Sequence, residues 1–89
     1  MWNNRLNLKC IGDEYADDLY SQYIEGDDVV RNKLNNLWAS PKTLAHWNKC
    51  REYFASKGIL LNRRQSITIS QYACSRLKQM VSTYWANYS

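Results

Sequence analysis

His46 and Cys50 are four residues apart, the spacing at which two side chains on one helix can share a metal ion. Zinc requires three or four ligands, however, and His46 is the only histidine among the 89 residues. The other two cysteines, Cys10 and Cys74, are distant in the sequence, and no Cys-X-X-Cys pair is present. We therefore expect no metal site, no cofactor, and three inert thiols buried in the core of a cytoplasmic protein.

Paired acids are the second candidate for chemistry. Asp17 and Asp18 complete the sequence Tyr15-Ala16-Asp17-Asp18, which resembles the metal-binding Tyr-X-Asp-Asp turn of reverse transcriptases. That resemblance implies paired carboxylates that hold divalent ions during phosphoryl transfer, on a β-hairpin with apolar flanks. Charged and polar residues flank this sequence instead, and its apolar residues follow a helical period. The acids fit the first turns of a helix, where they complement the helix dipole, and we expect the protein not to be an enzyme.

The charges are divided unequally along the chain. The net charge is +4, but all seven acids other than Glu52 lie between Asp13 and Asp28. From Ser40 onward, eight basic residues face this single acid, which indicates an anionic partner for the basic half. No segment has the roughly 18 apolar residues of a membrane span, and the first residues lack the apolar centre of a signal peptide. We therefore expect no membrane association.

The first half of the chain is predicted to form an extended arm and two helices. Residues 5–11 alternate only partly between apolar and polar side chains, so we expect a short strand or an extended N-terminal arm there. A helix is predicted from Asp13 to about Glu25, because its apolar residues recur every three or four positions. A second short helix is predicted to begin after a cap at Asp27 or Asp28.

The second half is predicted to contain two longer helices. The first covers 41–57, with Ser40 as its N-cap, and Gly58 is placed to adopt the left-handed conformation that ends a helix. Thr68 begins a capping box for the other helix, which is predicted to run to about residue 87. Residues 59–69 also fit a small β-hairpin with two arginines at its tip.

The predicted fold is thus mainly α, a compact four-helix domain that spans 1–89. The alternative is an α+β arrangement similar to a winged helix, in which the hairpin at 59–69 would be the wing.

Helix 41–57 carries the first predicted functional surface. A helical wheel places its apolar residues on one side and a basic stripe with interleaved aromatic residues on the other. Lysines would contact phosphates in such a stripe, and a helix of this width fits the major groove. We expect a small nucleic-acid-binding protein, with duplex DNA as its target. The predicted contact residues are Lys42, His46, Lys49, Tyr53, Lys57, Arg63 and Arg64.

The acidic first helix supports a different function. Acids and aromatic residues together form many protein-binding faces, so the protein would then be an inhibitor or adaptor acting on a larger protein. A homodimer that pairs the acidic half of one copy with the basic half of another also fits this charge pattern. The residues predicted for this alternative are Glu14, Asp18, Tyr20 and Glu25.

Overall fold

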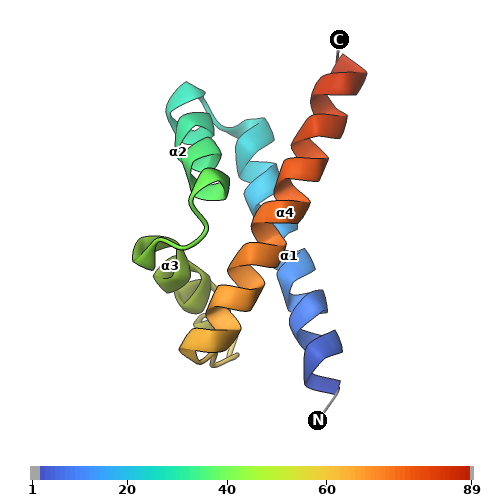
Figure 1. Cartoon of the computed structure of the whole chain (residues 1–89). Coiled ribbons are helices and arrows are strands. Elements are labelled where there is room, and N and C mark those ends of the chain that lie inside the picture. The colour runs from blue at the N-terminus through green and yellow to red at the C-terminus, as the bar shows by residue number, and fades with distance from the viewer. Residues whose placement is uncertain (1–2, 89) are drawn as a thin grey trace.

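The computed structural model describes the backbone of residues 3–88 and the side chains of residues 10–87. Four helices account for most of this range, and no strand occurs within it (Figure 1). The prediction of a mainly α, four-helix fold is therefore confirmed. The helices are α1 (Asn3–Glu25), α2 (Asp28–Ala39), α3 (Leu44–Ala55) and α4 (Arg63–Tyr88).

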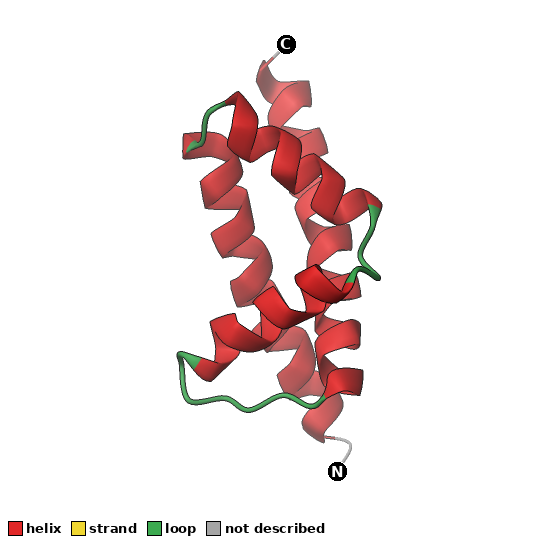
Figure 2. Cartoon of the chain, turned by 90° about the vertical axis from the view of Figure 1, so that its left-hand side faces the viewer, coloured by secondary structure: helices red, strands yellow, loops and turns green. Residues whose placement is uncertain are grey.

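The two long helices, α1 and α4, pack side by side and run in the same direction. Asp13 of α1 accepts a hydrogen bond from Tyr72, and further along both helices Trp85 donates to the Tyr23 hydroxyl at 3.0 Å. The two shorter helices cross in front of this pair when α2 and α3 face the viewer (Figure 2). The buried core draws side chains from all four helices.

The predicted N-terminal arm is wrong, because α1 already begins at Asn3 and continues through residues 5–11. Near Gly12, α1 approaches α4 closely. Gly12 permits the close approach, because a Cβ at this position would overlap the ring of Tyr72. The predicted buried face of the helix is confirmed, and it consists of Tyr15, Ala16, Leu19 and Tyr23.

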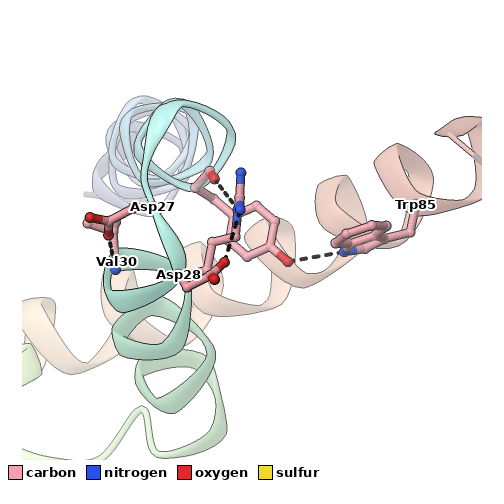
Figure 3. Close-up of polar contacts among 6 residues, drawn as sticks. Asp27, Asp28, Val30 and Trp85 are labelled. Atoms are coloured by element: carbon pink, nitrogen blue, oxygen red, sulfur yellow. Dashed lines mark hydrogen bonds and ion pairs between the residues drawn. The ribbon is translucent and has the colours of Figure 1, made fainter.

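The corner between α1 and α2 is fixed by polar contacts (Figure 3). Asp27, one of the two predicted caps, is the N-cap of α2, and its carboxylate accepts a hydrogen bond from the backbone N–H of Val30 at 3.1 Å. Arg31 bridges the corner, because its Nε donates to the carbonyl of Tyr23 at 3.2 Å and its guanidinium lies 3.4 Å from the carboxylate of Asp28. These contacts set the direction in which α2 leaves α1.

The third helix begins three residues later than predicted. Thr43, not Ser40, is its N-cap, and the Thr43 hydroxyl accepts from the backbone N–H of His46 at 3.4 Å. Pro41 favours the second position of a β-turn, and the hydrogen bond from Thr43 N to Ser40 O at 3.3 Å closes that turn. The indole N–H of Trp47 donates to the carbonyl of Pro41 at 2.8 Å and holds the turn against the helix.

α3 ends at Ala55, two residues before the predicted end, but the predicted type of ending is confirmed. Gly58 has a φ of +83°, and the N–H of Ile59 donates to the carbonyl of Phe54 at 2.9 Å. The N–H of Gly58 also bonds to the carbonyl of Ala55 at 3.0 Å. This pair of hydrogen bonds is a Schellman motif, in which a left-handed residue satisfies the last carbonyls of a helix.

The fourth helix begins earlier than predicted, at Arg63. Asn62 and Gln65 form a reciprocal capping box, because the Asn62 side chain accepts from Gln65 N at 2.8 Å and the Gln65 side chain accepts from Asn62 N at 3.0 Å. Thr68, the predicted cap, lies inside the helix, and its hydroxyl donates to the carbonyl of Arg64 at 3.1 Å. The β-hairpin at 59–69, and with it the winged-helix alternative, is therefore wrong.

Candidate nucleic-acid interface

His46 is buried in the core, with only 1% of its surface exposed, so its predicted place on a solvent-facing stripe is wrong. Leu44, which was expected on the buried side, is instead 64% exposed. The side of α3 that faces the core consists of His46, Cys50 and Phe54, which follow one another at intervals of four residues. The buried and exposed sides of α3 therefore differ from those that the helical wheel predicts.

The imidazole of His46 lies among other buried polar groups. Its two ring nitrogens are 3.7 and 3.6 Å from the sulfur of Cys74, and its ring stacks on that of Tyr15 with centroids 6.2 Å apart. Burial lowers the pKa of His46, because the charged form would lose its hydration. The same effect raises the pKa of the Cys50 thiol to about 11 and that of Cys74 to about 12. A neutral imidazole and two protonated thiols therefore occupy the core at neutral pH.

Cysteine placement agrees only partly with expectation. Cys50 and Cys74 are buried, as predicted, but Cys10 is exposed, so the prediction of three core thiols is wrong for this residue. Within the part of the chain that the structure describes, no three histidine, cysteine or acidic side chains are arranged to hold a metal ion.

Two further residues of the predicted stripe have partners inside the molecule. The ring of Tyr53 is half-buried against Tyr15, with centroids 5.1 Å apart. The ammonium group of Lys57 lies 4.9 Å from the centroid of the Tyr53 ring and forms an ion pair with Glu14 of α1. The Glu14 carboxylate raises the pKa of Lys57. Neither side chain belongs to the surface that remains open to an anionic partner.

Acids of α1 are paired with bases of the second half of the chain. The guanidinium of Arg76 donates to Asp13 at 2.8 Å and to Asp17 at 3.1 Å, and Lys57 pairs with Glu14. These partly exposed pairs contribute little to stability, but they neutralise acidic charge locally. The paired aspartates of the Tyr-X-Asp-Asp sequence thus lie on a helix, and one of them is held by an arginine.

One edge of the exposed side of α3 carries lysines. Lys49 is exposed and lines a groove between α2 and α3 together with Lys33 of α2. Asn36, Ser40 and Thr43 contribute polar side chains to the same groove, and no acid lines it. We call Lys33 and Lys49 the lysine flank. Lys42 is also exposed and lies in the turn that precedes α3.

The opposite edge carries arginines. Arg51 is exposed and lines a hollow between α3 and the segment that contains Leu60. The guanidinium of Arg63 stacks on the indole of Trp47, with Cζ 5.4 Å from the ring centroid, and Arg64 follows it at the exposed start of α4. We call Arg51, Arg63 and Arg64 the arginine flank. No residue of either flank, nor Lys42, has an acidic partner among the described side chains.

Between the two flanks runs a mostly uncharged surface of α3. Lys49 and Arg51 are two positions apart, which leaves an arc of about 160° between them on the exposed side of the helix. We call the exposed residues between them the α3 ridge. They are Leu44, Ala45, Asn48, Glu52 and Ala55.

The structure therefore keeps part of the predicted interface and adds to it. Lys42, Lys49, Arg63 and Arg64 are exposed, whereas the other three predicted residues are buried or paired. The sequence-based prediction did not include Lys33, and the helical wheel placed Arg51 and Trp47 on the apolar side of the helix. The basic character of the residues after Ser40 was a signal for Arg51, but nothing in the sequence indicates that α2 brings Lys33 beside Lys49.

Three residues of the alternative acidic surface, Glu14, Asp18 and Glu25, share one face of α1, and Tyr20 lies on another. Glu14 pairs with Lys57, and Asp18 accepts a hydrogen bond from Gln22 at 2.9 Å while lining a hollow towards α3. Tyr20 is half-buried and packs edge-on against Tyr84 of α4, with ring centroids 6.5 Å apart. Of the four predicted residues, Glu25 alone is exposed without a partner among the described residues.

No protein-family model matches this chain, and no curated protein or solved structure shows significant similarity to it. Among the described residues, no helix is both long enough and apolar enough to cross a membrane.

Proposed function

We propose that this chain is a non-enzymatic nucleic-acid-binding protein that inserts α3 into the major groove of duplex DNA. The observation that carries the proposal is the presence of unpaired, exposed cations along both edges of α3. A helix in the major groove lies between two phosphate backbones, so it needs positive charge on both of its sides. The lysine flank would contact one backbone and the arginine flank the other.

The dimensions of α3 suit this placement. An α-helix with its side chains is about 10–12 Å wide, and the major groove is about 12 Å wide. The 12 residues of α3 span about 18 Å, which is close to the length of five base-pair steps. Figure 2 shows α3 in front of the two long helices, and the residues of its ridge are exposed.

The distribution of acids favours the same partner. Asp13, Glu14 and Asp17 have basic partners within the molecule, which reduces the repulsion that α1 would exert on a duplex. The bases of the two flanks have no such partners among the described residues. Unpaired positive charge is therefore present beside α3 and at the start of α4.

Fluorescence anisotropy with a labelled random-sequence duplex, measured from low to physiological salt, tests the proposal. We expect binding that weakens with the logarithm of salt concentration, at a slope of about −0.9 for each phosphate contact. Lys49→Glu should lower the affinity roughly tenfold at low salt, because it removes one contact and adds a repulsive charge.

Lys78→Glu is the matched control. Lys78 is also an exposed lysine, but it lines a hollow formed only by residues of α4, away from α3. The control should bind almost as well as the unmodified protein. An absence of binding at low salt, or an equal loss of affinity in both variants, would overturn the proposal.

A further inference from the structure

The α3 ridge contains two hydrogen-bonding side chains that have no partner in the molecule. Asn48 and Glu52 are both exposed, and neither makes a side-chain hydrogen bond or an ion pair with another described residue. They are four positions apart, so they lie on the same face of the helix, about 6 Å apart along its axis. Asn48 borders the hollow on the arginine side, and Glu52 borders the hollows on both sides of α3. This places both residues between the two cationic flanks.

We infer that Asn48 and Glu52 determine sequence specificity, Asn48 by binding adenine and Glu52 by binding cytosine. The inference rests on the proposed function, because the two side chains meet base edges only if α3 enters the major groove. Asparagine has one acceptor and one donor group, which match the N6 amino group and N7 of adenine in a bidentate pair. A carboxylate only accepts, and it pairs best with the N4 amino group of cytosine, because at adenine the N6 amino group stands beside N7, an acceptor that repels the carboxylate.

The charge of Glu52 supports this assignment. It is the only acid from Ser40 onward, and it lies among cations without pairing with any described one. A carboxylate at that point weakens binding to phosphates in general, so it reduces affinity for duplexes of every sequence. The Glu52 carboxylate regains a favourable contact only opposite the N4 amino group of a cytosine. Glu52 therefore disfavours duplexes that lack a cytosine at the corresponding position.

The neighbours of these two residues leave room for such contacts. Ala45 and Ala55 are small and exposed, so base pairs can approach the helix on either side of Asn48 and Glu52. Leu44 is exposed at the start of the ridge and offers an apolar contact of the kind that the methyl group of thymine accepts. With base pairs about 3.4 Å apart along the duplex, the rise between Asn48 and Glu52 corresponds to about two base-pair steps.

Selection of preferred duplexes from a randomised pool, followed by anisotropy measurements on single sequences, tests the inference. The selected sequences should contain an adenine and a cytosine about two steps apart. Replacing that A·T pair by G·C should lower the affinity of the unmodified protein about tenfold. Asn48→Ala should bind both duplexes equally, with its salt dependence unchanged. Glu52→Ala should bind random duplexes more tightly and lose the preference for cytosine.

Asn35→Ala is the control, because Asn35 is an exposed asparagine of α2 that does not line the groove beside α3. It should keep the sequence preference of the unmodified protein. If Asn48→Ala keeps that preference while binding remains salt-dependent, the assignment of Asn48 is overturned and the proposed function stands. If the unmodified protein binds no duplex at low salt, both are overturned.

Discussion

The guanidinium of Arg63 lies over the indole ring of Trp47, with Cζ 5.4 Å from the ring centroid. Arg63 is the first residue of α4 and Trp47 belongs to α3, so this contact links the two helices that carry the arginine flank. The indole is itself held by the hydrogen bond from its N–H to the carbonyl of Pro41. Arg63 is therefore positioned before any partner binds, which lowers the entropy that it would lose on contacting a phosphate.

Replacing Arg63 by lysine should weaken duplex binding although the charge is unchanged. A lysine ammonium group does not stack flat on an indole, so its side chain would have to be ordered at the moment of binding. We expect a loss of affinity of about two- to fivefold, measured by anisotropy at fixed salt concentration. Arg64→Lys is the matched control and should show a smaller loss, because Arg64 has no aromatic partner among the described side chains. Equal losses would contradict a positioning role for Trp47.

Protonation of His46 should destabilise the fold as the pH falls. Burial lowers the pKa of His46 in the folded protein below the value of about 6.5 that applies when the chain is unfolded. Between these two pKa values the unfolded state binds more protons, so stability is complete above the unfolded pKa and is lost as the pH drops below it. The free energy of unfolding should fall by up to about 1.4 kcal/mol per pH unit below about pH 6.5.

Denaturant unfolding at several pH values between 5 and 7.5, compared with the variant His46→Leu, measures this effect. The comparison removes the contribution of other titrating groups, which the two proteins share. As the pH falls, the unmodified protein should lose stability relative to the variant His46→Leu. A difference that does not vary with pH would show that His46 is not buried in its neutral form.

The three cysteines should react at very different rates. Cys10 is exposed, whereas Cys50 and Cys74 are buried and have pKa values raised to about 11 and about 12. Thiolates are the reactive form, so a thiol reagent at pH 8 should modify one cysteine rapidly in the folded protein and all three in denaturant. Mass spectrometry of peptides would identify Cys10 as the fast site. Rapid modification of Cys74 would contradict its place beside His46.

The capping box at the start of α4 should contribute measurably to stability. Asn62→Ala removes the acceptor for the N–H of Gln65 and should cost about 1 kcal/mol. Thr68→Ala removes only a hydroxyl within the helix and should change stability by less than about 0.5 kcal/mol. Chemical denaturation of both variants checks the difference. If Thr68→Ala were the more costly change, the helix would begin where the sequence alone predicted it.

The number and approximate position of the helices could be predicted because their apolar residues recur with a helical period. Their starting points could not, because the chain offers competing signals. Both Asn62 and Thr68 are followed three residues later by glutamine, and each fits a capping box. Packing decides between them, since the additional turns bury Ser66 against the core. Ser40 and Thr43 compete in the same way at the start of α3, where the β-turn at Pro41 favours Thr43.

The orientation of α3 was harder to predict than its position. The basic residues after Ser40 predict positive charge on α3 and at the start of α4, and the bases of these two segments are exposed. Which side of α3 faces the core depends on whether Leu44 or His46 is buried, and hydrophobicity favours Leu44. The structure buries His46 instead, because Cys74 and Tyr15 from two other helices surround its ring. The burial of His46 in place of Leu44 therefore depends on how the helices pack. It cannot be predicted from the spacing of apolar residues within α3.

Salt dependence of duplex binding in flank variants tests the central claim most directly. The claim is that cations on both edges of α3 contact phosphates. Two double variants separate the edges: Lys33→Gln with Lys49→Gln, and Arg51→Gln with Arg64→Gln. Each should reduce the magnitude of the slope of log affinity against log salt by about 1.8, which corresponds to two lost contacts. The two reductions should add when all four substitutions are combined. A slope that is unchanged in either double variant would contradict the placement of α3 between two phosphate backbones.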